Sequence, residues 1–219
     1  MPHRTYHQTR FTFDQRRETV WQILCQAYFN DLIDPDSHVL ELGAGYGHFI
    51  NNIRCKKKTA IDLWEGMTDY LGPEVSAHIG SVTNQNFLRD DSVDFVLASN
   101  LFEHLTQPQF AETLTEVNRV LRPGGSLNIL QPNYRLAYRE YFDDYTHCSI
   151  YSDVSLCDFL ETNGFSIVQC VPGFLPFSIK QSKGPIRPWL IKLYLASPWK
   201  PLAKQMLVRA QPRSSRTLT

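Results

Sequence analysis

The sequence lacks the features that define several protein classes. Its five cysteines are odd in number and include no C-x-x-C pair, which argues against a disulfide framework and a zinc knuckle. No apolar run approaches the roughly 20 residues that a membrane span needs, and residues 1–7 lack the apolar core of a signal peptide. The formal net charge is zero, which argues against electrostatic nucleic-acid binding. We therefore expect a cytoplasmic protein without a metal site and with nucleic acid as an improbable partner.

Strand-like apolar runs alternate with helix-like segments along most of the 219 residues. This alternation predicts a Rossmann-like, doubly wound α/β sheet with helices on both faces. We expect seven strands, mostly parallel with an antiparallel last strand. They fall near residues 38–42, 59–62, 75–79, 92–98, 126–130, 165–171 and 204–210.

A glycine-rich turn follows the first predicted strand. The segment Glu41-Leu42-Gly43-Ala44-Gly45-Tyr46-Gly47 carries three glycines at alternate positions, which let the backbone turn sharply and approach a ligand closely. We expect a helix to begin near Gly47. Asp62 ends the second predicted strand, where an acidic side chain can receive the two hydroxyls of a ribose. A helix-capping role is the alternative for Asp62.

Polar or small residues close the other predicted strands as well. Ser81, Asn100 and Asn133 stand at the ends of the third, fourth and fifth strands. Because ligands of doubly wound sheets bind beyond the carboxyl ends of parallel strands, these residues should converge with Gly43 and Asp62. The pattern predicts a nucleotide-like ligand at this edge of the sheet.

The motifs, in this order, resemble those of class I S-adenosylmethionine-dependent methyltransferases of the methyltransferase domain 11 type. They are the glycine turn, Asp62, the strand around Asp94-Phe95-Val96, then Leu101-Phe102-Glu103-His104-Leu105, and Leu121-Arg122-Pro123-Gly124-Gly125. A dinucleotide fingerprint would need glycine at position 48, where this chain has histidine. The resemblance covers about residues 36–171.

The resemblance implies S-adenosyl-L-methionine as the cofactor. Glu41 would reach the methionine ammonium, Asp62 the ribose hydroxyls, and Leu63 the adenine. In many relatives an acidic residue follows the third strand and meets the adenine amine, whereas this chain has Ser81. The full set implied for cofactor binding is Glu41, Gly43, Ala44, Gly45, Asp62, Leu63, Ser81 and Asn100.

The segment after the fifth strand is polar and aromatic and should face the methyl acceptor. His147 is the leading candidate for a catalytic base, because the unperturbed pKa of histidine lies near neutrality; its alternative is to tie its loop to Asp143 or Asp144. His104 is the second candidate, or it holds its helix together with Glu103. Residues expected to contact substrate are Asn133, Tyr134, Arg135, Tyr138, Asp144 and Tyr145.

The predicted organisation has three parts. Residues 1–35 form an N-terminal helical cap, residues 36–211 form the methyltransferase domain, and residues 212–219 form a disordered tail. Substrate-side elements are expected at 132–152 and 172–203. The first of these, with its Pro-Asn-Tyr-Arg and Asp-x-x-His elements, is similar to methyltransferases associated with polysaccharide or lipid-glycan biosynthesis.

The predicted function is methyl transfer to a small-molecule, glycan or lipid-linked acceptor, at oxygen or nitrogen, by in-line attack. The alternative is a non-catalytic S-adenosylmethionine-binding sensor or partner subunit with the same fold. Residues 187–200 carry a tryptophan near each end and basic side chains. They either pack on the domain as a lid or lie at a membrane surface as a peripheral contact.

Overall fold

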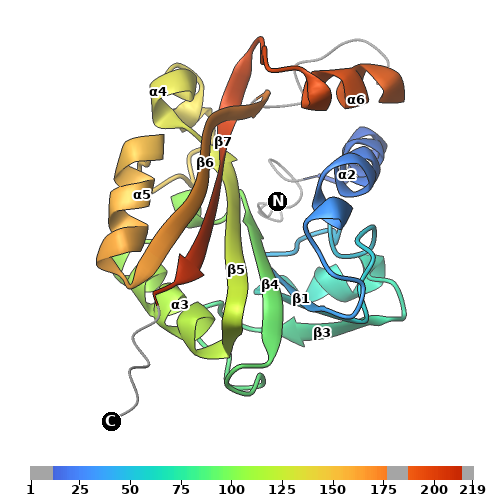
Figure 1. The fold of residues 1–219 in the computed structure, drawn as a ribbon, viewed down its shortest axis with the longest axis vertical. Coiled ribbons are helices and arrows are strands. Elements are labelled where there is room, and N and C mark those ends of the chain that lie inside the picture. Colours follow the sequence, from blue (N-terminus) through green and yellow to red (C-terminus); the bar gives the residue numbers. More distant parts are fainter. Residues whose placement is uncertain (1–11, 177–186, 214–219) are drawn as a thin grey trace, which may run out of the picture.

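A seven-stranded sheet forms the centre of the structure, a computed structural model that describes residues 12–176 and 187–213 (Figure 1). The strand order is β3-β2-β1-β4-β5-β7-β6. Strands β1 to β5 pair in parallel, and β7 runs antiparallel to both β5 and β6. The predicted fold class is confirmed. The strands are β1 His38–Leu42, β2 Lys57–Asp62, β3 Val75–Ile79, β4 Val93–Ser99, β5 Leu121–Pro132, β6 Phe165–Pro176 and β7 Ala203–Pro212.

Helices cover both faces of the sheet. Helices α2 (Gln15–Ala27) and α6 (Pro188–Ala196) lie on one side of it, and α3 (Gln107–Val120) and α5 (Asp153–Thr162) lie on the other (Figure 1). A short helix α4 (Tyr134–Ala137) follows β5. Single 3₁₀ turns occupy Phe29–Asp31, Phe102–His104 and Tyr141–Asp143, and a longer one occupies Glu65–Tyr70.

Strand β4 divides the hydrophobic core into two layers. Phe95 and Leu97 point into the layer beneath α2, whereas Val96 and Ala98 point into the layer beneath α3 and α5. Successive side chains of a strand face opposite sides of the sheet, so a strand buried on both faces reads as a continuous apolar run. That run is why β4 is recognisable in the sequence.

Side chains with local cap interactions fix the helix starts. Asp14 accepts a hydrogen bond from the backbone N of Arg16 at the start of α2. Capping boxes at Thr106 and Ser152 start α3 and α5. These caps satisfy donors that a helix cannot pair internally.

The helix predicted to begin near Gly47 is absent; the described chain forms consecutive turns over residues 45–52. Gly47 has a φ of +66°, which breaks helical geometry. The backbone N of Ile50 donates to the carboxyl of Glu41 at 3.0 Å, in place of a helical carbonyl. The side-chain amide of Asn52 donates to the backbone carbonyl of His48, and this bond competes with helical pairing of that carbonyl.

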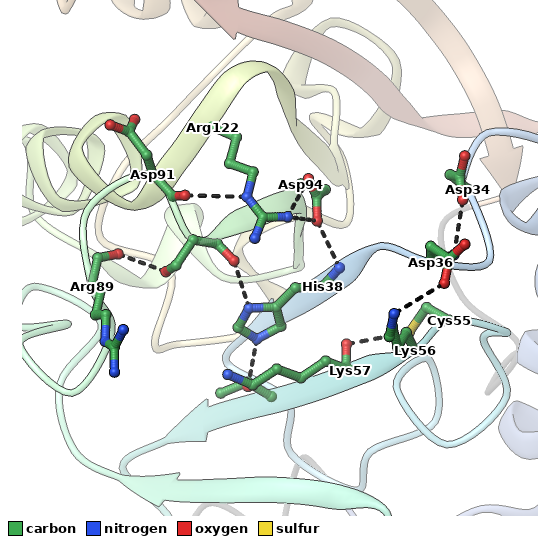
Figure 2. Close-up of polar contacts among 12 residues, drawn as sticks. Asp34, Asp36, His38, Cys55, Lys56, Lys57, Arg89, Asp91, Asp94 and Arg122 are labelled. Atoms are coloured by element: carbon green, nitrogen blue, oxygen red, sulfur yellow. Dashed lines mark hydrogen bonds and ion pairs between the residues drawn. The ribbon is translucent and has the colours of Figure 1, made fainter.

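The amino ends of the strands are joined by a polar network (Figure 2). The backbone N of His38 donates to Asp94 at 2.7 Å, and one terminal guanidinium nitrogen of Arg122 donates to both oxygens of the same carboxylate. The ring of His38 bonds the carbonyl of Ser92 and the hydroxyl of Thr59, both at 2.8 Å. The network thereby links the starts of β1, β2, β4 and β5.

The predicted tail at 212–219 lies outside the described residues except for its first two positions, and β7 reaches Pro212. None of the helices in the described ranges is long and apolar enough to cross a membrane.

Candidate functional site

The glycine turn is held against the carboxyl end of β2. The backbone N atoms of Gly43 and Ala44 both donate to the carbonyl of Ile61, at 2.9 and 3.2 Å. Gly43 and Gly45 have φ values of +66° and +52°, a region that favours glycine. The backbone N of Gly45 donates to the carboxylate of Asp62 at 2.8 Å. The structure therefore brings the predicted turn and the predicted ribose ligand into direct contact.

Asp62 also caps the chain that follows it. Its second carboxylate oxygen accepts from the backbone N of Trp64 at 2.8 Å, so the capping alternative describes a real contact. Each oxygen of a carboxylate has about two acceptor sites, and one backbone donor leaves room for a ribose hydroxyl. Leu63, beside it, is 74% exposed and offers a flat apolar surface. Ser81 instead bonds the hydroxyl of Thr83 at 2.8 Å, within its own turn.

Glu41 lies beneath the turn and is 4% exposed. Burial raises its pKa well above the usual value, the bond from the backbone N of Ile50 opposes that rise, and the charge of Asp62 adds to it. A cation close to the carboxyl would favour its ionised form. The position suits the ammonium contact predicted for Glu41.

Asn100 closes β4 with a φ of +50°, a conformation that asparagine tolerates better than most residues. Its backbone N donates to the carbonyl of Leu130, and its side-chain oxygen accepts from Gln205 at 2.9 Å. Gln205 belongs to β7, more than 100 positions away, and sequence reasoning missed it. Nothing in the type or sequence position of this glutamine predicts its contact with Asn100.

An aromatic cluster beside the glycine turn was also missed. Tyr46, inside the turn, packs against Trp64 and Tyr70 with ring centroids 5.0 and 4.7 Å apart, and Phe13 stacks on Tyr70. Tyr46 is only 5% exposed. The variable positions of the glycine motif thus contribute to the wall of the site.

The two histidines of the acceptor side meet at the same edge of the sheet. The rings of His104 and His147 lie 4.8 Å apart, centroid to centroid, although 42 residues separate them in the chain. Thr146 stands beside them: its hydroxyl donates to Asp144 at 2.6 Å and contacts Nδ1 of His104 at 2.9 Å. Burial and the neighbouring His147 lower the pKa of His104 to about 4.

Glu103, next to His104, is fully buried. Burial raises its pKa to about 8, with a smaller contribution from the charge of Asp144. Its backbone carbonyl accepts from the backbone N atoms of Cys148 and Ser149, which fastens the acceptor-side loop to the end of β4. The sequence shows the Glu-His pair but not the burial of this carboxyl.

The remaining predicted substrate residues are dispersed. Asn133 is buried, and its side chain bonds Asp153 and the carbonyl of Pro172, so it holds the loop in place. Tyr134 packs edge-on against Tyr141. The others lie on the outer surface: Arg135 faces Asp153 at 3.6 Å, and Tyr138 and Tyr145 are 54% and 73% exposed.

Residues 40–129 match the sequence family described as methyltransferase domain. This region is a class I methyltransferase domain. The predicted resemblance to S-adenosylmethionine-dependent methyltransferases is thereby confirmed for this domain, and S-adenosylmethionine is the cofactor that such domains use. An uncharacterised methyltransferase-like protein of Schizosaccharomyces pombe is 37% identical over 105 residues, 45% of this chain and 40% of that protein.

A second relative, malonyl-[acyl-carrier protein] O-methyltransferase of Methylococcus capsulatus, is 30% identical over 133 residues, 54% of this chain and 47% of that one. The chain thus spans less than half the length of both methyltransferase relatives.

Solved methyltransferases share the whole architecture. A putative methyltransferase in a complex with the Haloferax volcanii Trm112 activator has a TM-score of 0.68 at 16% identity, over 91% of this chain and 92% of that chain. A methyltransferase from Archaeoglobus fulgidus has a TM-score of 0.65 at 20% identity, covering 89% and 93%. At these identities the likeness shows the fold alone.

Proposed function

We propose that this protein transfers the methyl group of S-adenosylmethionine to an oxygen or nitrogen of an acceptor held beside His104 and His147. The observation that carries the proposal is the meeting of two sets of residues at one edge of the sheet. The Gly45–Asp62 contact marks the donor end, and the histidine pair marks the acceptor end.

At the donor end, the chain's own groups fit the cofactor that the family uses. Glu41 would receive the ammonium, Asp62 the ribose hydroxyls and Leu63 the adenine. Asn100, held by Gln205, would complete the ammonium site. The bound sulfonium supplies an electrophilic methyl group, so the protein's task is to orient the acceptor, which can contribute roughly 7 to 11 kcal/mol in well-aligned intramolecular reactions.

At the acceptor end, the hydrogen bonds of Thr146 prepare His104. The single proton of the Thr146 hydroxyl goes to Asp144, so Nδ1 of His104 must donate to that hydroxyl. This assigns the neutral tautomer with the lone pair on Nε2. His104 and His147 then form a proton-accepting pair near a neutral acceptor, and His147 remains the proposed base.

We base the proposed class of acceptor on three side chains that lie on the outer surface of the segment after β5. Tyr138 and Tyr145 are exposed aromatic side chains, and Arg135 carries a forked donor group able to bind a carboxylate or phosphate. Such residues suit a small-molecule, glycan or lipid-linked acceptor. The O-methyltransferase name of one relative supports oxygen as the methylated atom.

Helix α6 supports a peripheral membrane contact of residues 187–200 as part of the proposal. Trp189, Leu190 and Leu193 are 57%, 46% and 60% exposed, while Tyr194 and Leu195 pack against the core beneath α2. Flotation with anionic liposomes at low salt tests this, and a protein that stays at the bottom of the gradient removes the contact from the proposal.

The deciding experiment incubates the protein with methyl-labelled S-adenosylmethionine and an extract of its own source, followed by identification of the labelled product. We expect one labelled class of acceptor. Cofactor binding without any labelled product would favour the sensor or partner-subunit alternative.

A further inference from the structure

The carboxyl of Glu103 is a buried group without a counterpart. Its side chain is 0% exposed, and neither carboxylate oxygen has a hydrogen-bond partner in another of the described residues; only its own backbone N–H opposes the effect of burial on its pKa. A buried polar group left unsatisfied costs roughly 1–3 kcal/mol, and more if it is charged. A bound ligand that interacts with this carboxyl would offset that cost.

His104 presents a ring nitrogen in the state that a ligand requires. The contact between Nδ1 and the Thr146 hydroxyl, which itself bonds Asp144, is compatible with a proton on Nδ1. A metal-bound histidine characteristically donates its other ring N–H to an oxygen acceptor, which sets the tautomer and ring orientation. The Thr146 hydroxyl, itself bonded to Asp144, could be such an oxygen acceptor for His104.

His147 brings the third group from a different part of the chain. One potential ligand atom from each of Glu103, His104 and His147 lies within 4.8 Å of the other two. The backbone bonds from Cys148 and Ser149 to the carbonyl of Glu103 hold the His147 loop at this distance. The cluster is therefore built by two fastened segments and does not rest on loose surface chains.

We propose that Glu103, His104 and His147 bind a divalent transition-metal cation, of which Zn²⁺ is the representative probe. Two imidazoles and one carboxylate are a ligand set of catalytic zinc sites, which keep an open fourth position. Ligand atoms around one tetrahedral zinc ion lie roughly 3.3 Å apart, and those of the three side chains lie within 4.8 Å of one another, so no pair has to close by more than about 1.5 Å when the cation binds.

With the cation bound, His147 would act as a ligand in place of the base named above, and the cation would act on the acceptor; this role rests on the proposed function. A hydroxyl at the open position loses its proton to solvent more readily, because the cation stabilises the oxyanion. In methyl transfer the acceptor oxygen then forms its bond to the methyl carbon as the sulfur–carbon bond breaks. Zn²⁺ binding itself requires neither donor nor acceptor, so it is testable separately.

The test is calorimetric titration of the metal-free full chain with Zn²⁺, without S-adenosylmethionine or acceptor. We expect one site that weakens by roughly 100-fold or more in Glu103→Gln and in His147→Ala, since loss of outer-shell partners alone costs about 10- to 100-fold. Thr146→Val, which removes only the outer support, should weaken binding by about tenfold.

Two control variants separate this site from adventitious binding. Cys148→Ser removes an exposed thiol next to His147. His78→Ala removes a histidine of β3 whose ring stacks on Phe87. Both should bind Zn²⁺ like the original chain. Near-ultraviolet circular dichroism establishes whether each variant is folded. If Glu103→Gln does not fold, His147→Ala alone carries the test.

The proposal is overturned if the original chain shows no Zn²⁺ site, or if Glu103→Gln and His147→Ala both keep its affinity. It is equally overturned if Cys148→Ser alone abolishes binding, because the thiol would then be the ligand. None of these results depends on methyl transfer.

Discussion

The two ends of the parallel strands differ in how well their polar side chains are supplied with hydrogen-bond partners. At the amino end, Asp94 accepts from the backbone N of His38 and pairs with Arg122, and the ring of His38 is bonded at both nitrogens (Figure 2). At the carboxyl end, Glu41 has its pKa raised by burial, and Glu103 is buried without a hydrogen-bond partner for its carboxyl.

This difference separates groups that hold the sheet together from groups held for ligands. A satisfied buried network rigidifies a fold, whereas an unsatisfied polar group lowers stability and persists at functional sites. A shallow hollow at the amino end is lined by Asp34, Asp94 and Pro123, but Asp94 is already engaged there. This contrast supports our proposal that the functional site lies at the carboxyl end.

Removing the histidine proposed as base should have the largest effect. His147→Ala should lower turnover by roughly 100- to 10,000-fold, the contribution typical of a general base, while S-adenosylmethionine affinity is unchanged. Initial rates with the identified acceptor and calorimetry with the cofactor measure the two quantities. Full turnover by this variant would remove His147 from the mechanism.

Breaking the satisfied network should instead reduce stability. Asp94→Ala leaves the backbone N of His38 without its acceptor and removes the ion pair of Arg122, which keeps its bond to the carbonyl of Asp91, so the free energy of unfolding should fall by about 1–3 kcal/mol. Urea denaturation measures it. If the stability were unchanged, the amino-end network would not hold the strands as argued.

The matching substitution at the other end should be nearly neutral. Glu103→Gln replaces a buried carboxyl that has no hydrogen-bond partner with a neutral group of similar shape, so in chelator-treated buffer the free energy of unfolding should change by less than about 1 kcal/mol. Loss of more stability than in Asp94→Ala would mean that the Glu103 carboxyl has a structural partner.

The smallest expected effect concerns pH. Burial lowers the pKa of His38 below its value in the unfolded chain, about 6.5. The folded state then binds fewer protons than the unfolded state, so the stability contributed by neutral His38 is complete above about pH 6.5 and declines as the pH falls toward the folded pKa.

Urea denaturation at pH 7.5 and 5.5, compared with His38→Gln, isolates this contribution. The original chain should lose more stability than the variant over the interval. An equal loss in both would assign the pH dependence to other histidines.

The strands and the glycine turn were largely predictable from sequence, because both depend on local patterns, whereas the roles of the donor-side residues stay predictions. The double-sided apolar run of β4 and the glycines of the turn each have a local physical cause. The helix expected after Gly47 does not form, because the backbone N of Ile50 donates to the side chain of Glu41 and not to a helical carbonyl. A competing acceptor brought in by the fold leaves no periodic signal.

The acceptor side was predictable only in part. His104 and His147 were each predicted from their type and position, and their catalytic role stays a prediction; their contact depends on backbone bonds from residues 148 and 149 to Glu103. The burial of the Glu103 carboxyl and the engagement of Asn133 by Asp153 likewise arise from tertiary packing. Sequence spacing does not encode such contacts.

Calorimetric titration with S-adenosylmethionine of the original chain, Asp62→Ala and Asp94→Ala tests the central claim most directly. Asp62 and Asp94 lie at opposite ends of the strands, and both accept backbone hydrogen bonds. We predict that Asp62→Ala abolishes binding and that folded Asp94→Ala retains the original affinity. Absence of binding to the original chain at millimolar cofactor, or equal affinity in all three proteins, would contradict the account.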